Sequence, residues 1–126
     1  MNRLAFRCAV LLLLATASAC NICSDEVLSQ TSPPDGVVTA TSFVRNCGAT
    51  TDFSTIVSVH KSSEGYGNDH DFVFVVKGRP DLKAIWNGPD KLTITCIGCI
   101  RANVYRQITV VADIDIIYEI GSATGL

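Results

Sequence analysis

The 126-residue sequence lacks most of the features that identify a function directly. It has two histidines and one tryptophan, and its ten lysines and arginines face twelve aspartates and glutamates. Without an excess of positive charge there is no basic patch for nucleic acid, so no nucleic-acid partner is expected. No recognisable catalytic constellation is present either, and we expect neither a resident metal nor a cofactor.

The sequence also lacks an apolar run of the roughly 20 residues that a membrane-spanning helix needs. The apolar run Val10–Ala15 is far shorter. The cations Arg3 and Arg7 precede it, and the small residues 16–19 follow it. That order of positive, apolar and small residues is typical of an export signal. We therefore expect residues 1–19 to be a signal peptide.

Cys20 follows the signal directly, and the small residues that end in this cysteine resemble a bacterial lipobox. In a lipobox the cysteine thiol is acylated, which predicts a lipoprotein held at the cell membrane or outer membrane, facing the periplasm or exterior. Ala17-Ser18-Ala19 also satisfies the rule for the general signal peptidase, and Ala17 stands where a lipobox prefers leucine. A secreted protein without lipid is the alternative.

The cysteine count supports lipidation. Loss of the signal removes Cys8 and leaves five cysteines, an odd number that needs an explanation in an exported protein. If Cys20 carries lipid, four cysteines remain and can form two disulfides in an oxidising compartment. These four are Cys23, Cys47, Cys96 and Cys99.

The chain from Cys20 to Leu126 suits one small domain. Without Arg3 and Arg7 it keeps eight basic residues against twelve acidic ones, a net charge of −4. This composition does not favour electrostatic docking onto anionic lipid. Membrane contact is therefore expected to come from the anchor.

Residues 20–30 are expected to be a tether, with one short helical turn that starts at Ser24. The turn cluster Thr31–Gly36 then opens a single β domain, residues 31–126, because prolines and an Asp-Gly pair favour a tight bend. After Gly36 the apolar pattern has a period of two, typical of strands, and no helical stripe.

Four segments carry this pattern. Apolar and polar residues alternate over Phe53–His60, which predicts one core face and one wet face. Phe72–Val76 is apolar on both sides, as in a central strand. Leu92–Cys96 alternates, and Val104–Tyr118 alternates with a bend or hairpin near Ala112-Asp113. We expect six or seven strands in a small antiparallel sandwich or open barrel.

Three interpretations fit Cys96-Ile97-Gly98-Cys99. The favoured one is a disulfide clip at the end of a hairpin, with Ile97-Gly98 as its turn. The others are a thiol-redox pair and, together with the pair Cys20 and Cys23, a structural zinc site. The exported context favours disulfides over zinc.

Polar clusters give weaker hypotheses. Asn68–Asp71 gathers three metal-ligand side chains, but a solvated loop is the simpler interpretation. Gly48–Asp52 offers hydroxyl groups that could bind a carbohydrate or a partner loop, or satisfy their own backbone. Ser54, Ser58 and His60 share a strand face, yet no carboxylate is identifiable as the third member of a hydrolytic triad.

Two segments, Ser32–Gly36 and Val44–Val59, resemble the front half of a family of small exported bacterial proteins that contain a domain of unknown function. The run Cys47-Gly48-Ala49-Thr50-Thr51, followed by Phe53-Ser54-Thr55, carries most of this resemblance. It extends more loosely through Trp86, Pro89–Leu92 and Tyr118-Glu119. The resemblance implies that Cys23 pairs with Cys47, and it implies no activity or ligand. Cys96 and Cys99 depart from the family pattern.

We therefore expect a non-enzymatic lipoprotein with a binding or structural role in the bacterial envelope and an envelope protein or glycan as partner. The first alternative is a small inhibitor or immunity module that acts on a cell-wall hydrolase. The second is a thiol-redox or metal-site protein that uses Cys96 and Cys99.

Overall fold

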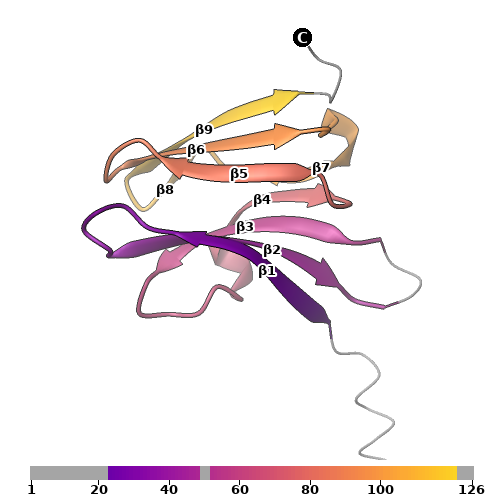
Figure 1. Cartoon of the computed structure of the whole chain (residues 1–126), viewed down its shortest axis with the longest axis horizontal. Helices are drawn as coiled ribbons and strands as arrows, with labels where there is room; N and C mark the ends of the chain where they lie inside the picture. The colour runs from indigo at the N-terminus through magenta and orange to yellow at the C-terminus, as the bar shows by residue number, and fades with distance from the viewer. Residues whose placement is uncertain (1–22, 49–51, 122–126) are drawn as a thin grey trace, which may run out of the picture.

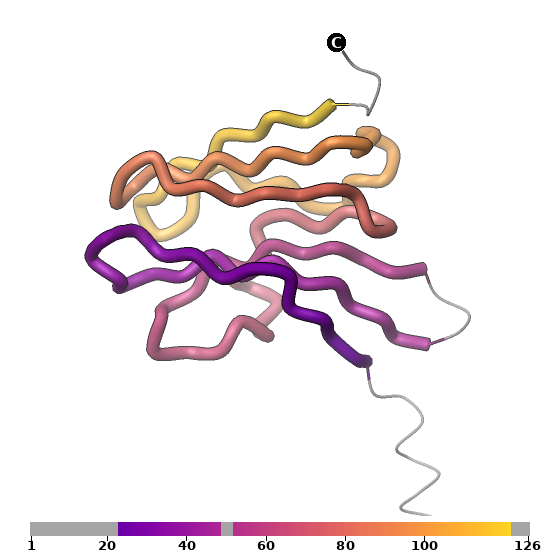
Figure 2. Tube along the Cα trace, in the orientation of Figure 1, coloured from indigo at the N-terminus to yellow at the C-terminus, as the bar shows by residue number. Residues whose placement is uncertain are grey.

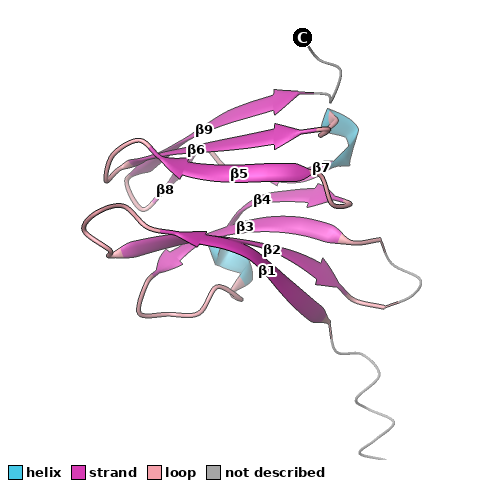
Figure 3. Ribbon diagram, in the orientation of Figure 1, coloured by secondary structure: helices cyan, strands magenta, loops and turns pink. Residues whose placement is uncertain are grey.

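The computed structural model describes residues 23–48 and 52–121. They form nine β-strands and two short 3₁₀ helices, and the strands make two sheets packed face to face (Figures 1 and 3). The predicted all-β class is confirmed, and the architecture is the sandwich. The predicted signal peptide, Cys20 and residues 49–51 lie outside the described residues.

One sheet has five strands in the order β1-β2-β3-β4-β7, and every neighbouring pair is antiparallel. Its strands are β1 (Ser24–Thr31), β2 (Val38–Asn46), β3 (Ser54–Lys61), β4 (Phe72–Lys77) and β7 (Val104–Gln107). The 3₁₀ helix η2 (Asp69–Asp71) precedes β4, and η3 (Arg101–Asn103) precedes β7.

The other sheet has four strands in the order β5-β6-β9-β8. They are β5 (Asp81–Trp86), β6 (Lys91–Ile97), β9 (Ile114–Gly121) and the two-residue β8 (Val110–Val111). β6 and β9 run parallel, which differs from the all-antiparallel expectation. They can do so because the chain between them crosses to the five-stranded sheet as β7 and returns, as the tube in Figure 2 shows.

The core lies between the sheets and follows the predicted alternation. Leu92, Ile94 and Cys96 of β6 are all fully buried, and Val57, Phe74 and Val76 meet them from the five-stranded sheet. Phe72–Val76 lies between β3 and β7, as predicted for a central strand. Tyr118 links the two sheets, because its hydroxyl donates towards the carbonyl oxygens of Ile108 at 2.6 Å and Val73 at 3.0 Å.

The N-terminal segment is a strand, which corrects the prediction of a tether with a helical turn. Ser24–Thr31 forms β1, paired along its length with β2. Its side chains are nearly all exposed, so the segment lacks the apolar alternation that reveals a strand. The folded domain therefore starts before the turn cluster, which forms a turn closed by a Gly36 N–H bond to the Pro33 carbonyl.

The hairpin predicted near Ala112-Asp113 is confirmed. Both residues have positive φ, 47° and 63°, the conformation that a two-residue hairpin turn requires. Ile114 and Ile116 are buried as predicted, but Val110 is 59% exposed and Val111 packs on the core instead.

The turn after Cys96 is not a hairpin, which corrects a second prediction. Gly98 has φ of 86° and its N–H bonds the Gly121 carbonyl, and the chain then leaves this sheet for β7 in the other one. A disulfide still joins Cys96 to Cys99, as predicted. It braces a crossover between sheets.

Candidate functional site: the outer face of the five-stranded sheet

The outer face of the five-stranded sheet carries a second apolar cluster, where a wet face was predicted. Phe43, Ile56 and Phe72 are buried there, and Tyr66 packs against them from the connection between β3 and β4. The Phe43 ring centroid lies 4.7 Å from that of Tyr66 and 5.6 Å from that of Phe72. This cluster gives the outer face a firm apolar floor.

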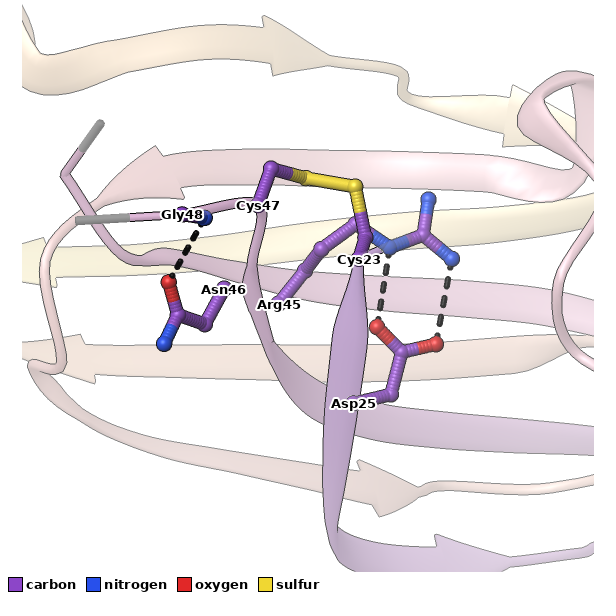
Figure 4. Close-up of a disulfide and its surroundings, with 6 residues drawn as sticks. All are labelled: Cys23, Asp25, Arg45, Asn46, Cys47 and Gly48. Atoms are coloured by element: carbon purple, nitrogen blue, oxygen red, sulfur yellow. Dashed lines mark hydrogen bonds and ion pairs between the residues drawn. A yellow bond between two sulfur atoms is a disulfide. The ribbon is translucent and has the colours of Figure 1, made fainter. Parts of the chain in front are cut away.

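Arg45 lies over this floor. Its guanidinium carbon is 5.3 Å from the Phe43 ring centroid and 5.5 Å from that of Phe72. The register opposes Asp25 to Arg45, and the guanidinium donates to both carboxylate oxygens at 2.9 and 3.1 Å (Figure 4). Both side chains are largely covered, 23% and 19% exposed. The bond to Asp25 raises the pKa of Arg45, against the opposing effect of burial.

A disulfide fixes the strand ends beside this pair. Cys23 and Cys47 continue the register of β1 and β2 by one step beyond Ser24 and Asn46 and are bonded (Figure 4). The Asn46 side chain accepts a bond from the Gly48 N–H at 3.1 Å. The pairing implied by the family resemblance is therefore present in the structure.

An open groove of about 420 Å³ runs over the same face. Arg45, Ile56, Phe72 and Val75 line its floor, and Tyr105 and Arg106 of β7 line one side. The Tyr105 side chain is 64% exposed, so its ring is free to contact a ligand. Asp52, Ser54 and Asp69 add oxygen atoms to the lining.

Arg106 is held in place by backbone and not by a carboxylate. Its Nη1 donates to the carbonyl oxygen of Asp69 at 2.7 Å and to that of Phe72 at 3.3 Å. Arg106 lines the groove, and among the described residues no ion pair neutralises its charge. Nε and Nη2 remain as donors for a ligand.

Asp52, the last residue of the Gly48–Asp52 loop proposed as a binding element, pairs with Lys77 at 3.0 Å. The hydrogen bond to Asp52 is the main reason why the pKa of Lys77 is raised. The three central residues of that loop, Ala49–Thr51, lie outside the described residues.

The serine and histidine side chains do not form a catalytic arrangement. Ser54, Ser58 and His60 share the outer face as predicted, but His60 is 5% exposed and engaged on both ring nitrogens, by Thr41 at 2.8 Å and by the Lys61 carbonyl at 2.9 Å. The Ser58 hydroxyl is buried with no hydrogen-bond partner among the described residues. Thr41, not a carboxylate, orients the imidazole.

The four cysteines that the structure describes offer no free thiolates for zinc. Cys23, Cys47, Cys96 and Cys99 are all in disulfides, and Cys96 and Cys99 are 0% and 4% exposed. In the part of the chain that the structure describes, no group of three potential metal ligands occurs. Asn68–Asp71 forms η2 and its approach, and its acidic side chains do not converge there.

Sequence reasoning missed Tyr105, Arg106, Arg45 and the aromatic floor. They come from β2, β4, β7 and the connection after β3, and strand register alone brings them together. The one available signal was the apolar interruption at Ile56 on an otherwise polar side of its strand.

Comparisons with models of protein families, with curated proteins and with solved structures find no match for this chain. The resemblance to a family of small exported bacterial proteins therefore stays a prediction. Among the described residues there is no helix with the length and apolar character that crossing a membrane would require. The two disulfides are compatible with an oxidising compartment outside the cytoplasm.

Proposed function

We propose that this protein is an exported, non-catalytic binding protein of the bacterial envelope, anchored through lipid on Cys20, whose outer groove binds a glycan. The observation that carries the proposal is the groove itself, where an exposed Tyr105 ring stands beside the unneutralised Arg106 guanidinium.

The chemistry of the lining favours a saccharide. A sugar ring presents an apolar C–H face and a rim of hydroxyls, and Tyr105 supplies an aromatic surface for the first. Arg106 can donate to the rim, and Asp69 and Ser54 can accept from it. An open groove also suits a segment of a long polymer, which an enclosed cavity would exclude.

The rigidity of the site supports binding without large rearrangement. Arg45 is held by two hydrogen bonds and two aromatic rings, and the adjacent strand ends are cross-linked by Cys23–Cys47. Preorganised groups lose little conformational entropy when a ligand binds. The burial of Cys96 and Cys99 disfavours the thiol-redox alternative, because an exchanging thiol must be accessible.

Calorimetric titration with soluble muropeptides, the disaccharide-peptide fragments of peptidoglycan, tests the groove. Arg106→Ala and Tyr105→Ala should each weaken binding about 10-fold or more, the effect of losing one charged hydrogen-bond donor or one stacking ring. Lys83→Ala, an exposed cation on the other sheet, should leave affinity unchanged. Unchanged binding in both groove variants would refute the site.

Intact-mass measurement of the protein extracted from bacterial membranes tests the anchor. Acyl chains on Cys20, together with two disulfides, are expected. An unmodified Cys20 in the culture medium would instead establish a secreted protein. Should a purified cell-wall hydrolase form a stoichiometric inhibited complex, the protein would be an inhibitor or immunity module.

A further inference from the structure

We infer that the end of the sandwich nearest Cys20 is a docking surface for the lipid bilayer, so that the domain stands on the membrane in one orientation. This inference rests on the proposed lipid anchor. It goes further by naming which residues of the folded domain meet the bilayer.

The strand directions define this end. β1, β3, β5 and β7 begin there, and β2, β4, β6 and β9 finish there, on the right in Figure 1. The short links 78–80 and 98–103 join the two sheets at the same place. We call it the tether end. The opposite end, which holds the turns 32–37, 62–71, 87–90 and 112–113, is the turn end.

The covalent chain brings the tether end to the membrane. Only three peptide steps separate Cys20 from Cys23, which is fixed to Cys47 by the disulfide. Three residues span at most about 10 Å when fully extended. A lipid chain on Cys20 would therefore keep the tether end within about 10 Å of the headgroups and leave no room for a long spacer.

Exposed apolar side chains lie at this end. Phe53 is 41% exposed, Ile97 46% and Ile100 54%, and each sits in or next to a link between strands. Apolar groups at the tip of a domain lose contact with water when they enter the interfacial region of a bilayer. Arg79 covers one face of the Phe53 ring at 5.7 Å, and its guanidinium pairs with Glu26 at 2.8 Å.

The two ends also differ in net charge. At the tether end the opposite charges cancel within each of the ion pairs Arg45–Asp25, Lys77–Asp52 and Arg79–Glu26. The positive charge of Arg101 is matched in number by the negative charge of Asp81. Apart from Asp69 and Asp71 of η2, of which Asp69 lines the groove beside Arg106, the turn end carries five exposed carboxylates against two lysines. The carboxylates are Asp35, Glu64, Asp90, Asp113 and Asp115, and the lysines are Lys61 and Lys91.

Bacterial membranes that contain phosphatidylglycerol are negatively charged. They therefore repel the acidic turn end, whereas the neutral tether end can approach them without electrostatic repulsion. The net charge of −4 of the chain after residue 19 is thus concentrated away from the bilayer. Composition alone predicts that only the anchor contacts the membrane, because a net charge does not reveal how the charges are divided between the two ends of the domain.

Hydrogen exchange of the acylated protein tests the inference. It is measured in vesicles of phosphatidylethanolamine and phosphatidylglycerol. The reference is the same protein in detergent-free dilute solution after enzymatic removal of the acyl chains. In vesicles, the amides of residues 97–103 and of Gly78 and Arg79 should exchange at least about 5-fold more slowly, whereas those of 112–113 should not change. Equal rates at both ends, or slowing at the turn end, would overturn it.

Ile97→Ser with Ile100→Ser provides the matched variant. It should abolish the slowing at Gly78 and Arg79 while the acylated protein still sediments with the vesicles. Val37→Ser, which removes a 63% exposed apolar side chain from the turn end, is the control and should change nothing. If slowing persists in the double variant, the apolar surface is not the cause and the inference fails.

The outcomes separate this inference from the anchor on which it rests. An acylated protein without slowing at 97–103 would refute the docking surface and leave the anchor intact. A mass spectrum without acyl chains would refute the anchor, and the fixed orientation would fall with it.

Discussion

The outer faces of the two sheets are built from similar strands and yet differ in what they can do. On the four-stranded sheet the outer side chains are threonines, isoleucines and charged residues, and Ile85 and Ile117 are more than half exposed. On the five-stranded sheet the corresponding side chains form the buried cluster around Phe43 and an open groove. The difference arises because the ten-residue connection 62–71 packs under one sheet, whereas no connection within residues 23–48 and 52–121 covers the other.

The comparison indicates that the buried cluster around Phe43 is what gives the outer face of the five-stranded sheet a candidate binding site. Aromatic rings beneath Arg45 hold its guanidinium in place, and β7 brings Arg106 and Tyr105 to the edge of the same surface. The outer face of the other sheet carries charged side chains and the half-exposed Ile85 and Ile117, and neither buried cluster of the described residues lies on it.

The largest expected effect is the loss of the second cluster. Phe43→Ala removes a fully buried ring, and truncation of a buried phenylalanine costs about 3–5 kcal/mol. Urea unfolding should show this loss, whereas Ile117→Ala on the other face, where the side chain is 52% exposed, should cost less than about 1 kcal/mol. Equal costs would mean that the two faces do not differ in packing.

The disulfide of each sheet comes next. Cys23→Ala with Cys47→Ala opens a loop with a sequence separation of 24 and should lower the free energy of unfolding by about 3 kcal/mol. Cys96→Ala with Cys99→Ala opens a separation of 3, for which the loop contribution is about 1.5 kcal/mol. Chemical denaturation compares the two double variants. If the Cys96 and Cys99 variant lost more unfolding free energy than the Cys23 and Cys47 variant, the Cys96–Cys99 pair would contribute mainly through packing in the core.

Tyr118 joins the sheets and should show a smaller effect with a pH signature. Tyr118→Phe removes the donor of the Ile108 carbonyl oxygen, at a cost of about 1–3 kcal/mol at neutral pH, whereas the Val73 carbonyl still accepts from the Ile108 N–H. Burial raises the pKa of Tyr118 because it disfavours the phenolate. Since the folded pKa is the higher one, this stability is complete below the ordinary tyrosine pKa of about 10 and declines as the pH rises above it.

Thermal unfolding between pH 8 and pH 11 checks the pH signature. In Tyr118→Phe the melting temperature should fall less steeply as the pH rises, because the contribution of the Tyr118 phenol to that fall is absent. Tyr105→Phe, which alters an exposed phenol, should keep it. An alkaline decline of the same size in Tyr118→Phe would contradict the assignment.

The smallest effect concerns the ion pairs of the five-stranded sheet. Asp25→Asn weakens a bidentate pair whose side chains are mostly covered and should cost about 1 kcal/mol. Glu26→Gln disrupts the exposed pair with Arg79, 48% and 60% exposed, and should change the stability by less than about 0.5 kcal/mol. If the two substitutions cost the same, Arg45 is not fixed by its surroundings.

Local patterns in the sequence predicted the fold better than they predicted the site. Alternation located β3, β6 and the hairpin of β8 and β9, because a strand with one core face has a visible period of two, and the continuous apolar run Phe72–Val76 located β4. β1 has no core face of its own, since nearly all its residues are exposed, and it forms through pairing with β2 and the bond from Cys23 to Cys47. Nothing within the segment reveals this.

The groove depends on contacts that no local pattern encodes. Arg45 and Arg106 are 61 positions apart and share a face only because β2, β3, β4 and β7 are adjacent in that order. The parallel pairing of β6 with β9 likewise follows from the crossover through β7. The sequence predicts which residues alternate, and tertiary register decides which of them meet.

The most direct test of the central claim, that the outer face of the five-stranded sheet is the binding face, is an amide chemical-shift titration of the purified protein with soluble muropeptides. We expect shifts confined to the groove strands, at Arg45, Ser54, Val75, Tyr105 and Arg106. Shifts centred on Ile85, Thr93 and Ile117 of the other sheet, or none at millimolar ligand, would contradict it.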